Sequence, residues 1–239
     1  MGQMKNLVVL TGAGVSAESG IATFRDNGGL WDKYDPQVVA SIDGWNENPG
    51  LLLDFYNMRR KELEHVRPNS AHESIAALQE KFHVNVITQN VDNLHERAGS
   101  SNVLHLHGEL TKVRPENCCN ESDGFSESTV FDIGYGEVHL GELAPNGHQL
   151  RPHIVWFGEP VPKIERAIDI VSEADMLLIV GTSLSVYPAA GLYRYAPRDI
   201  SIYIIDPGTL KVHDSRLEQI KEKATAGMKI FEKISDGCL

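Results

Sequence analysis

The chain is poor in cysteine, in positive charge and in long apolar runs, and each shortage excludes a class of protein. Only three cysteines stand among 239 residues, and two of them, Cys118 and Cys119, are adjacent, so no disulfide framework is expected. Lysine and arginine number 22 against 33 aspartates and glutamates, which argues against binding to nucleic acid or to an anionic membrane. No stretch approaches the roughly 20 apolar residues that span a bilayer.

The same numbers indicate what kind of protein remains. Residues 1–6 run directly into the first apolar segment and leave no room for a secretory signal, so we expect a cytoplasmic protein with free thiols. The net charge of −11 would favour a cationic partner such as a lysine-bearing peptide. The length suits one domain; the sequence leaves the oligomeric state open, and we favour a monomer.

Five short apolar runs predict strands that are buried on both faces: residues 6–10, 84–88, 103–106, 176–180 and 201–205. Helical patterns such as that of residues 70–82 lie between several of them. Strands that alternate with helices predict an α/β fold, a Rossmann-like doubly wound parallel sheet.

Two segments fall outside this alternation. Residues 49–66 predict a separate helix, and residues 114–147 are rich in Gly, Asn, Ser and Glu, with β-like pieces only around 129–133 and 137–140. We therefore predict a single domain over residues 1–239 with two lobes. The large lobe takes about 1–30, 68–110 and 152–239, and the small lobe takes about 31–67, which is helical, and 111–151.

A glycine-rich turn follows the first predicted strand. Gly12, Gly14 and Ala17 match the dinucleotide form G-x-G-x-x-G/A, in which glycine lets the backbone approach a pyrophosphate at a helix N-terminus. Alone this match is weak, because glycine turns after strands are common. The polar continuation strengthens it: Ser16, Glu18, Ser19, Thr23 and Arg25, with Phe24 among them.

Four further strings follow in order: TQNVDNLH at 88–95, HLHGE at 105–109, RPHIVWFGE at 151–159 and GTS at 181–183. Together with the glycine turn they resemble the sirtuin family of NAD-dependent protein deacylases, over nearly the whole chain. The resemblance implies that NAD is a co-substrate. In that family the acyl-lysine oxygen forms an alkylimidate with C1′ of the NAD ribose, and nicotinamide leaves.

The resemblance also implies roles for the strand-end residues. His107 holds the position of the general base, which suits a side chain with a pKa near neutrality. Gln89 and Asn90 are expected at the nicotinamide ribose and an ordered water, and Asp92 at the nicotinamide carboxamide. The alternatives are structural: a hydrogen-bonded histidine at a strand end, and Asn90, Asp92 or Asn93 capping the next helix.

The remaining cofactor residues follow from the same matches. Phe24 and Arg25 belong to a loop expected to close over NAD. Asp206 departs from the family's usual Asn at the adenosine, and an acidic residue there would disfavour NADP. The full predicted NAD set is Gly12, Ala13, Gly14, Ser16, Ala17, Glu18, Thr23, Phe24, Arg25, Trp31, Gln89, Asn90, Val91, Asp92, Gly181, Thr182, Ser183, Asp206, Pro207 and Ala224.

Tyr56 and Arg59 indicate which acyl group is removed. They lie three residues apart, hence on one helix face, and match the Tyr-x-x-Arg pair of sirtuins that prefer succinyl- and malonyl-lysine. A guanidinium binds a carboxylate bidentately and a phenol adds a donor. Removal of acetyl groups stays possible. The alternative is a surface pair between Arg59 and Glu62; Arg60 with Glu64 is expected to form such a pair.

The acyl-lysine peptide is expected to bind by strand addition between residues 155–159 and 185–188. The predicted contact residues are Val155, Phe157, Gly158, Glu159, Val186 and Tyr187.

The metal site of the family is missing from the sequence. Most sirtuins hold a structural zinc with two Cys-x-x-Cys pairs in the inserted lobe, whereas this chain has only Cys118 and Cys119 there. His139 and His148 do not have a spacing that recommends a Cys₂His₂ set. We therefore expect no zinc, and a lobe held by its own β pieces and loops.

Other functions remain open at this stage. The same site could use water or a protein side chain as acceptor, as in an NAD glycohydrolase or an ADP-ribosyltransferase. A non-catalytic NAD-binding module and a hydride-transferring dehydrogenase are further alternatives. The peptide segments favour deacylation, and the combination of His107, Asn90 and Asp92 argues against an inactive module.

Overall fold

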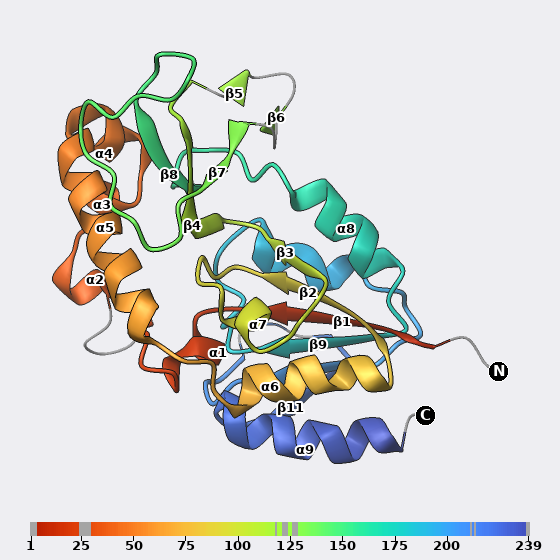
Figure 1. Ribbon diagram of the computed structural model, residues 1–239. Coiled ribbons are helices and arrows are strands. Elements are labelled where there is room, and N and C mark those ends of the chain that lie inside the picture. Colours follow the sequence, from red (N-terminus) through yellow and green to blue (C-terminus); the bar gives the residue numbers. More distant parts are fainter. Residues whose placement is uncertain are drawn as a thin grey trace.

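A six-stranded parallel sheet forms the centre of the protein (Figure 1). The computed structural model describes residues 4–23, 30–117, 119–120, 124–125, 129–210, 212 and 214–237. The strands are β1 (Asn6–Thr11), β2 (His83–Thr88), β3 (Val103–His105), β9 (Met176–Val180), β10 (Ile202–Ile205) and β11 (Leu217–Ile220). Their order is β11-β10-β9-β1-β2-β3, and every pair is parallel.

The predicted doubly wound sheet is thus confirmed, and the five predicted strands match to within one residue at either end. The apolar runs explain the placement, because β9 and residues 7–10 of β1 are fully or almost fully buried and need cover on both faces. Strand β11 was not predicted. It lies at the sheet edge and its sequence LEQI is half polar and exposed, so it lacks the apolar run of a central strand.

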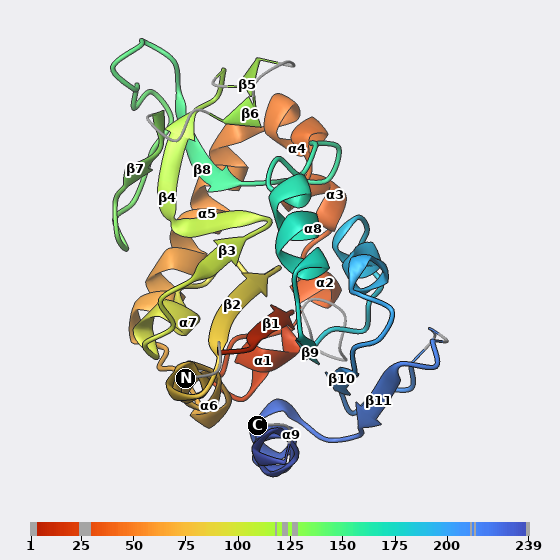
Figure 2. The ribbon, with the colours of Figure 1, turned by 90° about the vertical axis from the view of Figure 1, so that its right-hand side faces the viewer.

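Helices cover both faces of this sheet (Figure 2). On one face lie α6 (Ser70–Ala77), which continues as the 3₁₀ turn η1 (Leu78–Glu80), and α9 (Ala224–Asp236). On the other lie α8 (Ile164–Ser172) and the 3₁₀ segment η3 (Ala189–Tyr195). The predicted helix over 70–82 is therefore correct at its start and tightens near its end.

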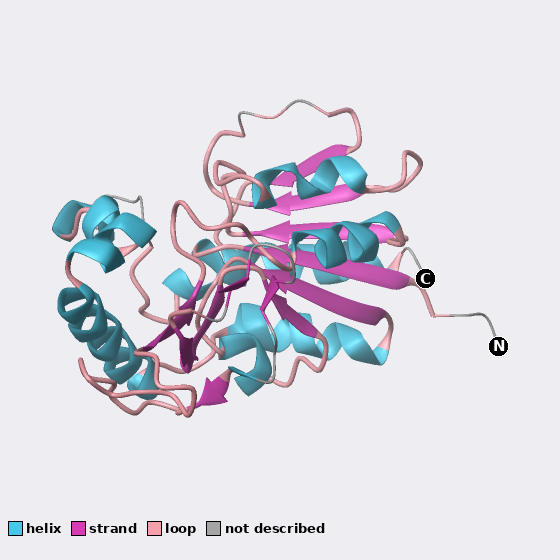
Figure 3. Ribbon diagram, turned by 90° about the horizontal axis from the view of Figure 1, so that it is seen from above, coloured by secondary structure: helices cyan, strands magenta, loops and turns pink. Residues whose placement is uncertain are grey.

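A group of helices lies beyond the carboxyl ends of the strands, as Figure 3 shows. It comprises α2 (Leu30–Lys33), α3 (Pro36–Val39), α4 (Ile42–Glu47) and α5 (Pro49–His65). The side chains of Asp35, Ser41 and Asn48 cap α3, α4 and α5. Two single-turn helices, α1 (Gly14–Ala17) and α7 (Leu94–Arg97), follow β1 and β2. Across the described ranges no helix is long and apolar enough to cross a membrane.

A second, antiparallel sheet packs against α5 and has the order β7-β4-β8. Its strands are β4 (Gly108–Pro115), β7 (Phe131–Asp132) and β8 (Leu150–Ile154), and a small pair, β5 (Cys119–Asn120) and β6 (Gly124–Phe125), lies beside it in Figure 1. The β piece expected around 129–133 is confirmed as β7. Our division of the chain into a large and a small lobe stays a prediction.

Two details of this region differ from the prediction. Residues 137–140 form no strand, because the Asn57 side-chain amide bonds both the N–H and the carbonyl of Val138, at 3.0 and 2.9 Å, where a neighbouring strand would. Arg60 does not form a surface pair with Glu64. It is fully buried and donates to the carbonyls of Leu110 and Gly136, since α5 presents this side chain to the second sheet.

Candidate active site

The centre of the site lies where the chain reverses its direction across the sheet. Strands β1 and β9 are neighbours, and the chain proceeds from β1 toward β2 and from β9 toward β10. Ligands of open α/β sheets bind beyond the carboxyl ends of the strands at such a point. The loops that follow these two strands carry Gly12 to Gly14 and Gly181 to Ser183.

The glycines let these two loops touch. Gly14 N–H donates to the Gly181 carbonyl at 2.9 Å, and a Cβ on Gly14 would lie 2.7 Å from Gly181 Cα. Gly181 has a φ of +64°, and a Cβ there would lie 2.3 Å from the backbone nitrogen of Val15. The glycines are thus required for loop packing in addition to the expected approach to a pyrophosphate.

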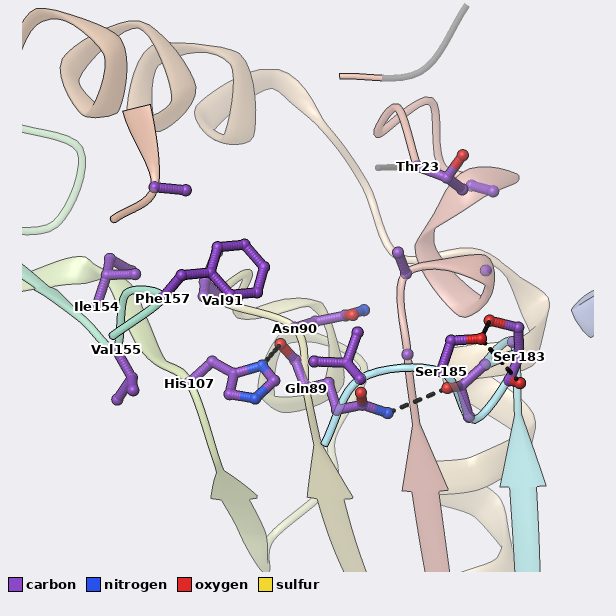
Figure 4. A pocket seen from close by; sticks show the side chains of 18 of the residues that line it. Thr23, Gln89, Asn90, Val91, His107, Ile154, Val155, Phe157, Ser183 and Ser185 are labelled. Carbon is purple, nitrogen blue, oxygen red and sulfur yellow. Dashed lines mark hydrogen bonds between the residues drawn. The ribbon is translucent and has the colours of Figure 1, made fainter. Parts of the chain in front are cut away.

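A cavity of about 1030 Å³ runs along these strand ends (Figure 4). The structure brings most predicted residues together on its wall. From the NAD set they are Gly12, Ala13, Gly14, Ala17, Glu18, Thr23, Gln89, Asn90, Val91, Gly181, Thr182, Ser183, Asp206, Pro207 and Ala224. From the catalytic and substrate sets they are His107, Tyr56, Arg59, Val155, Phe157, Gly158, Glu159, Val186 and Tyr187.

The other predicted residues do not line the cavity in the described part of the chain. Ser16 and Asp92 are buried behind the wall. Phe24 and Arg25 lie outside the described residues. Trp31 belongs to α2, and its side chain is outside the description.

His107 is held in the form that a base requires. Its Nδ1 lies 3.0 Å from the Gln89 carbonyl, as Figure 4 shows. A carbonyl only accepts, so Nδ1 carries the proton and the neutral ring keeps a lone pair on Nε2. Burial lowers the pKa of His107, against the opposing effect of this hydrogen bond. The ring is therefore neutral at pH 7 and able to accept a proton.

His105 fixes the same loop from the other side. Its Nδ1 donates to the Asn90 carbonyl at 2.9 Å and its Nε2 lies 2.8 Å from Glu96 Oε1. Burial lowers the pKa of His105, but the hydrogen bond and charge of Glu96 outweigh it, so that the pKa is raised. Two histidines thus hold the backbone of Gln89 and Asn90 at the cavity.

A hydrogen-bonded group beside the cavity consists of Ser16, Asn90 and Asp92. Ser16 Oγ donates to Asp92 Oδ2 at 3.0 Å and accepts from Asn90 Nδ2 at 3.1 Å. Asp92 Oδ1 accepts from Leu94 N–H, the first residue of α7, at 3.1 Å, whereas the side chain of the N-cap residue Asn93 makes no capping bond. Burial raises the pKa of Asp92. The capping alternative is therefore wrong for Asn93, and the expected contact of Asp92 with nicotinamide stays a prediction.

Tyr56 and Arg59 line the cavity from α5, and both are buried. Burial raises the pKa of Tyr56 to about 12. Burial lowers the pKa of Arg59, yet a guanidinium starts above about 12 and stays charged. The alternative contact also exists: Arg59 Nε lies 3.6 Å from Glu62 Oε2, on a side chain that is 61% exposed. Arg59 therefore faces the cavity, and within the described residues its ion-pair partner is the loosely held Glu62 at the surface.

The segment expected to bind a peptide already uses part of its backbone. Val155 N–H donates to the His107 carbonyl at 3.0 Å. Phe157 N–H donates to the Ala40 carbonyl at 2.9 Å, and the Phe157 carbonyl accepts from Ile42 N–H at 3.0 Å. Strand addition through these three backbone groups is thus blocked, and the peptide contacts expected elsewhere in residues 155–159 and 185–188 stay a prediction.

Glu159 lines the cavity, but its carboxylate is engaged within the protein. Arg151 binds it bidentately at 2.7 and 3.0 Å, and Trp156 N–H donates to it at 2.8 Å. Arg151, Trp156 and His105 were missed as functional residues. All three stand inside the strings that marked the site, so adjacency to Phe157, Glu159 and His107 was the available signal.

No group of three or more His, Cys, Asp and Glu side chains suited to a metal occurs among the residues that the structure describes. Cys118 lies outside those residues, and the side chain of Cys119 is not described. The absence of zinc therefore stays a prediction.

Comparison with known proteins places this cavity in a family. The model of the Sir2 family matches residues 12–188. An NAD-dependent protein deacylase of Bacteroides thetaiotaomicron is 53% identical over 97% of this chain and 98% of its own, and one of Helicobacter pylori is 52% identical over 94% and 95%. A solved Sir2 homologue–NAD complex is 36% identical, with a TM-score of 0.84 over 98% of this chain and 91% of that one.

A Sir2 complex with a deacetylated p53 peptide and 3′-O-acetyl ADP-ribose superposes with a TM-score of 0.78 at 30% identity, over 97% of this chain and 94% of that one. The match of the family model, the near full-length relatives and the shared architecture agree with the resemblance of the sequence strings. The chain belongs to the Sir2, or sirtuin, family.

Proposed function

We propose that this protein, an NAD-dependent protein deacylase, removes succinyl and malonyl groups from lysine. The deacylase activity is the one its near full-length relatives are named for. The acidic preference is supported by one observation: a buried arginine, Arg59, faces the same cavity as the base His107.

The energetics of Arg59 favour an acidic ligand. A buried guanidinium is costly unless it is paired, and the contact with Glu62 at 3.6 Å is loose and screened by water. A carboxylate that enters from the cavity could take two hydrogen bonds from the guanidinium and a third from the Tyr56 hydroxyl. An acetyl group has no carboxylate to offer, so its removal would be the weaker activity.

The residues present fit NAD. The cavity lies at the upper end of the size range of small-molecule sites, roughly 300–1,000 Å³, so it has room for an extended dinucleotide and an acyl chain. The loops at Gly12 and Gly181 would hold the phosphates, Gln89 and Asn90 the nicotinamide ribose, and Asp206 a hydroxyl of the adenosine ribose. When bound, NAD supplies an electrophilic ribose carbon with nicotinamide as leaving group.

The chain's own groups complete the chemistry. His107 Nε2 accepts a proton from a ribose hydroxyl, because its Nδ1–H is held by the Gln89 carbonyl. Gly158 and residues 185–186 would hold the lysine-bearing peptide, and the net charge of −11 favours a cationic one. We further propose that the lobe at 111–151 holds no zinc; one zinc per chain by metal analysis would refute this.

The test compares three peptides that differ only in the acyl group. Succinyl-, malonyl- and acetyl-lysine versions of one sequence are incubated with NAD, and nicotinamide and O-acyl-ADP-ribose are followed by mass spectrometry. We expect a higher kcat/KM for both acidic peptides. Faster turnover of the acetyl peptide would refute the acidic preference. Nicotinamide release at the same rate without any peptide would refute deacylation in favour of NAD hydrolysis.

A further inference from the structure

Tyr56 has a neighbour that decides in which direction its hydroxyl can donate. The indole Nε1 of Trp156 lies 2.8 Å from the Tyr56 oxygen. An indole N–H is a donor only, so the Tyr56 oxygen accepts this bond and its own proton must point elsewhere. The indole N–H thus restricts the directions that are left to the Tyr56 proton.

Trp156 is itself held from three sides. The guanidinium carbon of Arg151 lies 3.6 Å from the centroid of the Trp156 ring, and the Trp45 ring packs at 5.3 Å. The backbone N–H of Trp156 donates to Glu159, which binds Arg151 bidentately. The indole is 2% exposed. Its N–H therefore has one fixed direction, toward Tyr56.

The geometry points to Trp156 as a positioning residue for acyl specificity: its N–H orients the Tyr56 hydroxyl as a donor toward an acyl carboxylate held by Arg59. This inference rests on the proposed acidic preference. Tyr56, Arg59 and Trp156 all line the cavity, and Tyr56 and Arg59 lie one turn apart on α5, so a Tyr56 proton that is not directed at Trp156 can serve a ligand held by Arg59.

The protonation state of Tyr56 agrees with this role. Burial raises the pKa of Tyr56 to about 12, although the Trp156 bond and the charge of Arg59 act in the opposite direction. The phenol therefore keeps its proton at any pH at which the enzyme would be assayed.

The test is the ratio of kcat/KM for succinyl-lysine to that for acetyl-lysine in each variant, at saturating NAD. Trp156→Phe keeps an aromatic ring between Arg151 and Trp45 but removes the N–H. We expect the ratio to fall by about three- to tenfold, the range of one ordinary hydrogen bond. Tyr56→Phe should lower the ratio at least as much. In the double variant, Trp156→Phe should add nothing, because the hydroxyl it orients is gone.

The control is Trp45→Phe, which removes the same atoms from the same aromatic cluster without contacting the Tyr56 hydroxyl; its ratio should match the wild type. A benzothiophene analogue of tryptophan at position 156, with sulfur in place of N–H, keeps the shape and tests the inference if Trp156→Phe does not fold. Its ratio should fall as for Trp156→Phe.

The outcomes separate the inference from the proposed function. If Tyr56→Phe lowers the ratio and both Trp156 replacements leave it unchanged, the positioning role is refuted and the acidic preference stands. An equal loss on both peptides, or an equal effect of Trp45→Phe, also refutes positioning, since it indicates general packing. If the wild type shows no acidic preference, the proposed function fails, and the inference fails with it.

Discussion

Replacing Arg59 should separate acidic from neutral acyl substrates. Arg59 is only 9% exposed. Arg59→Met keeps an unbranched apolar side chain on α5 and removes the guanidinium. A hydrogen bond to a charged group contributes about 1.5–3 kcal/mol, and about 1.4 kcal/mol is tenfold in kcat/KM. We therefore expect succinyl-lysine kcat/KM to fall by about 10- to 150-fold. Acetyl-lysine, which has no carboxylate, should change far less.

The assay follows nicotinamide release from both peptides at saturating NAD, with thermal unfolding measured in parallel. Removing a buried charge whose ion-pair partner among the described residues lies 3.6 Å away and is largely exposed should not lower the Tm. Glu62→Gln is the matched control, because it removes the exposed partner 3.6 Å from Arg59. An exposed ion pair of this kind contributes about 0.2–1 kcal/mol to stability. In Glu62→Gln the Arg59 guanidinium loses this partner, so kcat/KM for succinyl-lysine should stay equal or rise slightly. A succinyl loss under about threefold, or an equal loss on both peptides, would refute the argument.

Three further predictions concern the base, the second sheet and the pH dependence. His107→Gln should abolish deacylation while NAD still binds, as measured by calorimetry; full activity would contradict its role as base. Arg60→Met should lower the free energy of unfolding by about 1–3 kcal/mol in urea, because it leaves buried carbonyls without donors. Because the pKa of His105 is raised in the folded protein, the contribution of His105 to the free energy of unfolding should be complete below about pH 6.5, the pKa of an unfolded histidine. It should be lost as the pH rises through the folded pKa of His105. Burial raises the pKa of Glu96, but His105 outweighs it and lowers that pKa, so stability should also be lost as the pH falls through the folded pKa of Glu96. Glu96→Gln should therefore make the urea midpoint depend less on pH, both at acidic and at neutral pH.

The sheet was predictable because its central strands are continuous apolar runs between helical patterns. Residues 176–180 were placed with their observed bounds, whereas β11 was missed because an edge strand needs no apolar run. The residues that line the cavity were predictable as strings, since each string contains or follows the end of a strand and strand ends meet in space.

The partners of these residues were not predictable. Asn57 lies 81 residues from Val138 and completes its backbone bonds like a missing strand, and Trp156 lies 100 residues from the hydroxyl that it contacts. Arg60 is buried and does not form the expected surface pair with Glu64, because the orientation of α5 against the second sheet decides which charged side chains of α5 are buried. Local spacing predicts which residues share a face and not what that face meets.

The contact between Gly14 and Gly181 restricts how this enzyme can be redesigned. Backbone meets backbone there, so neither loop can gain a side chain unless the two halves of the sheet move apart. Libraries that aim to change cofactor preference should therefore keep both glycines and vary the wall beside them, where Asp206 and Lys223 line the cavity. The junction of the two halves is fixed by geometry, and adaptation to a new dinucleotide has to take place at its periphery.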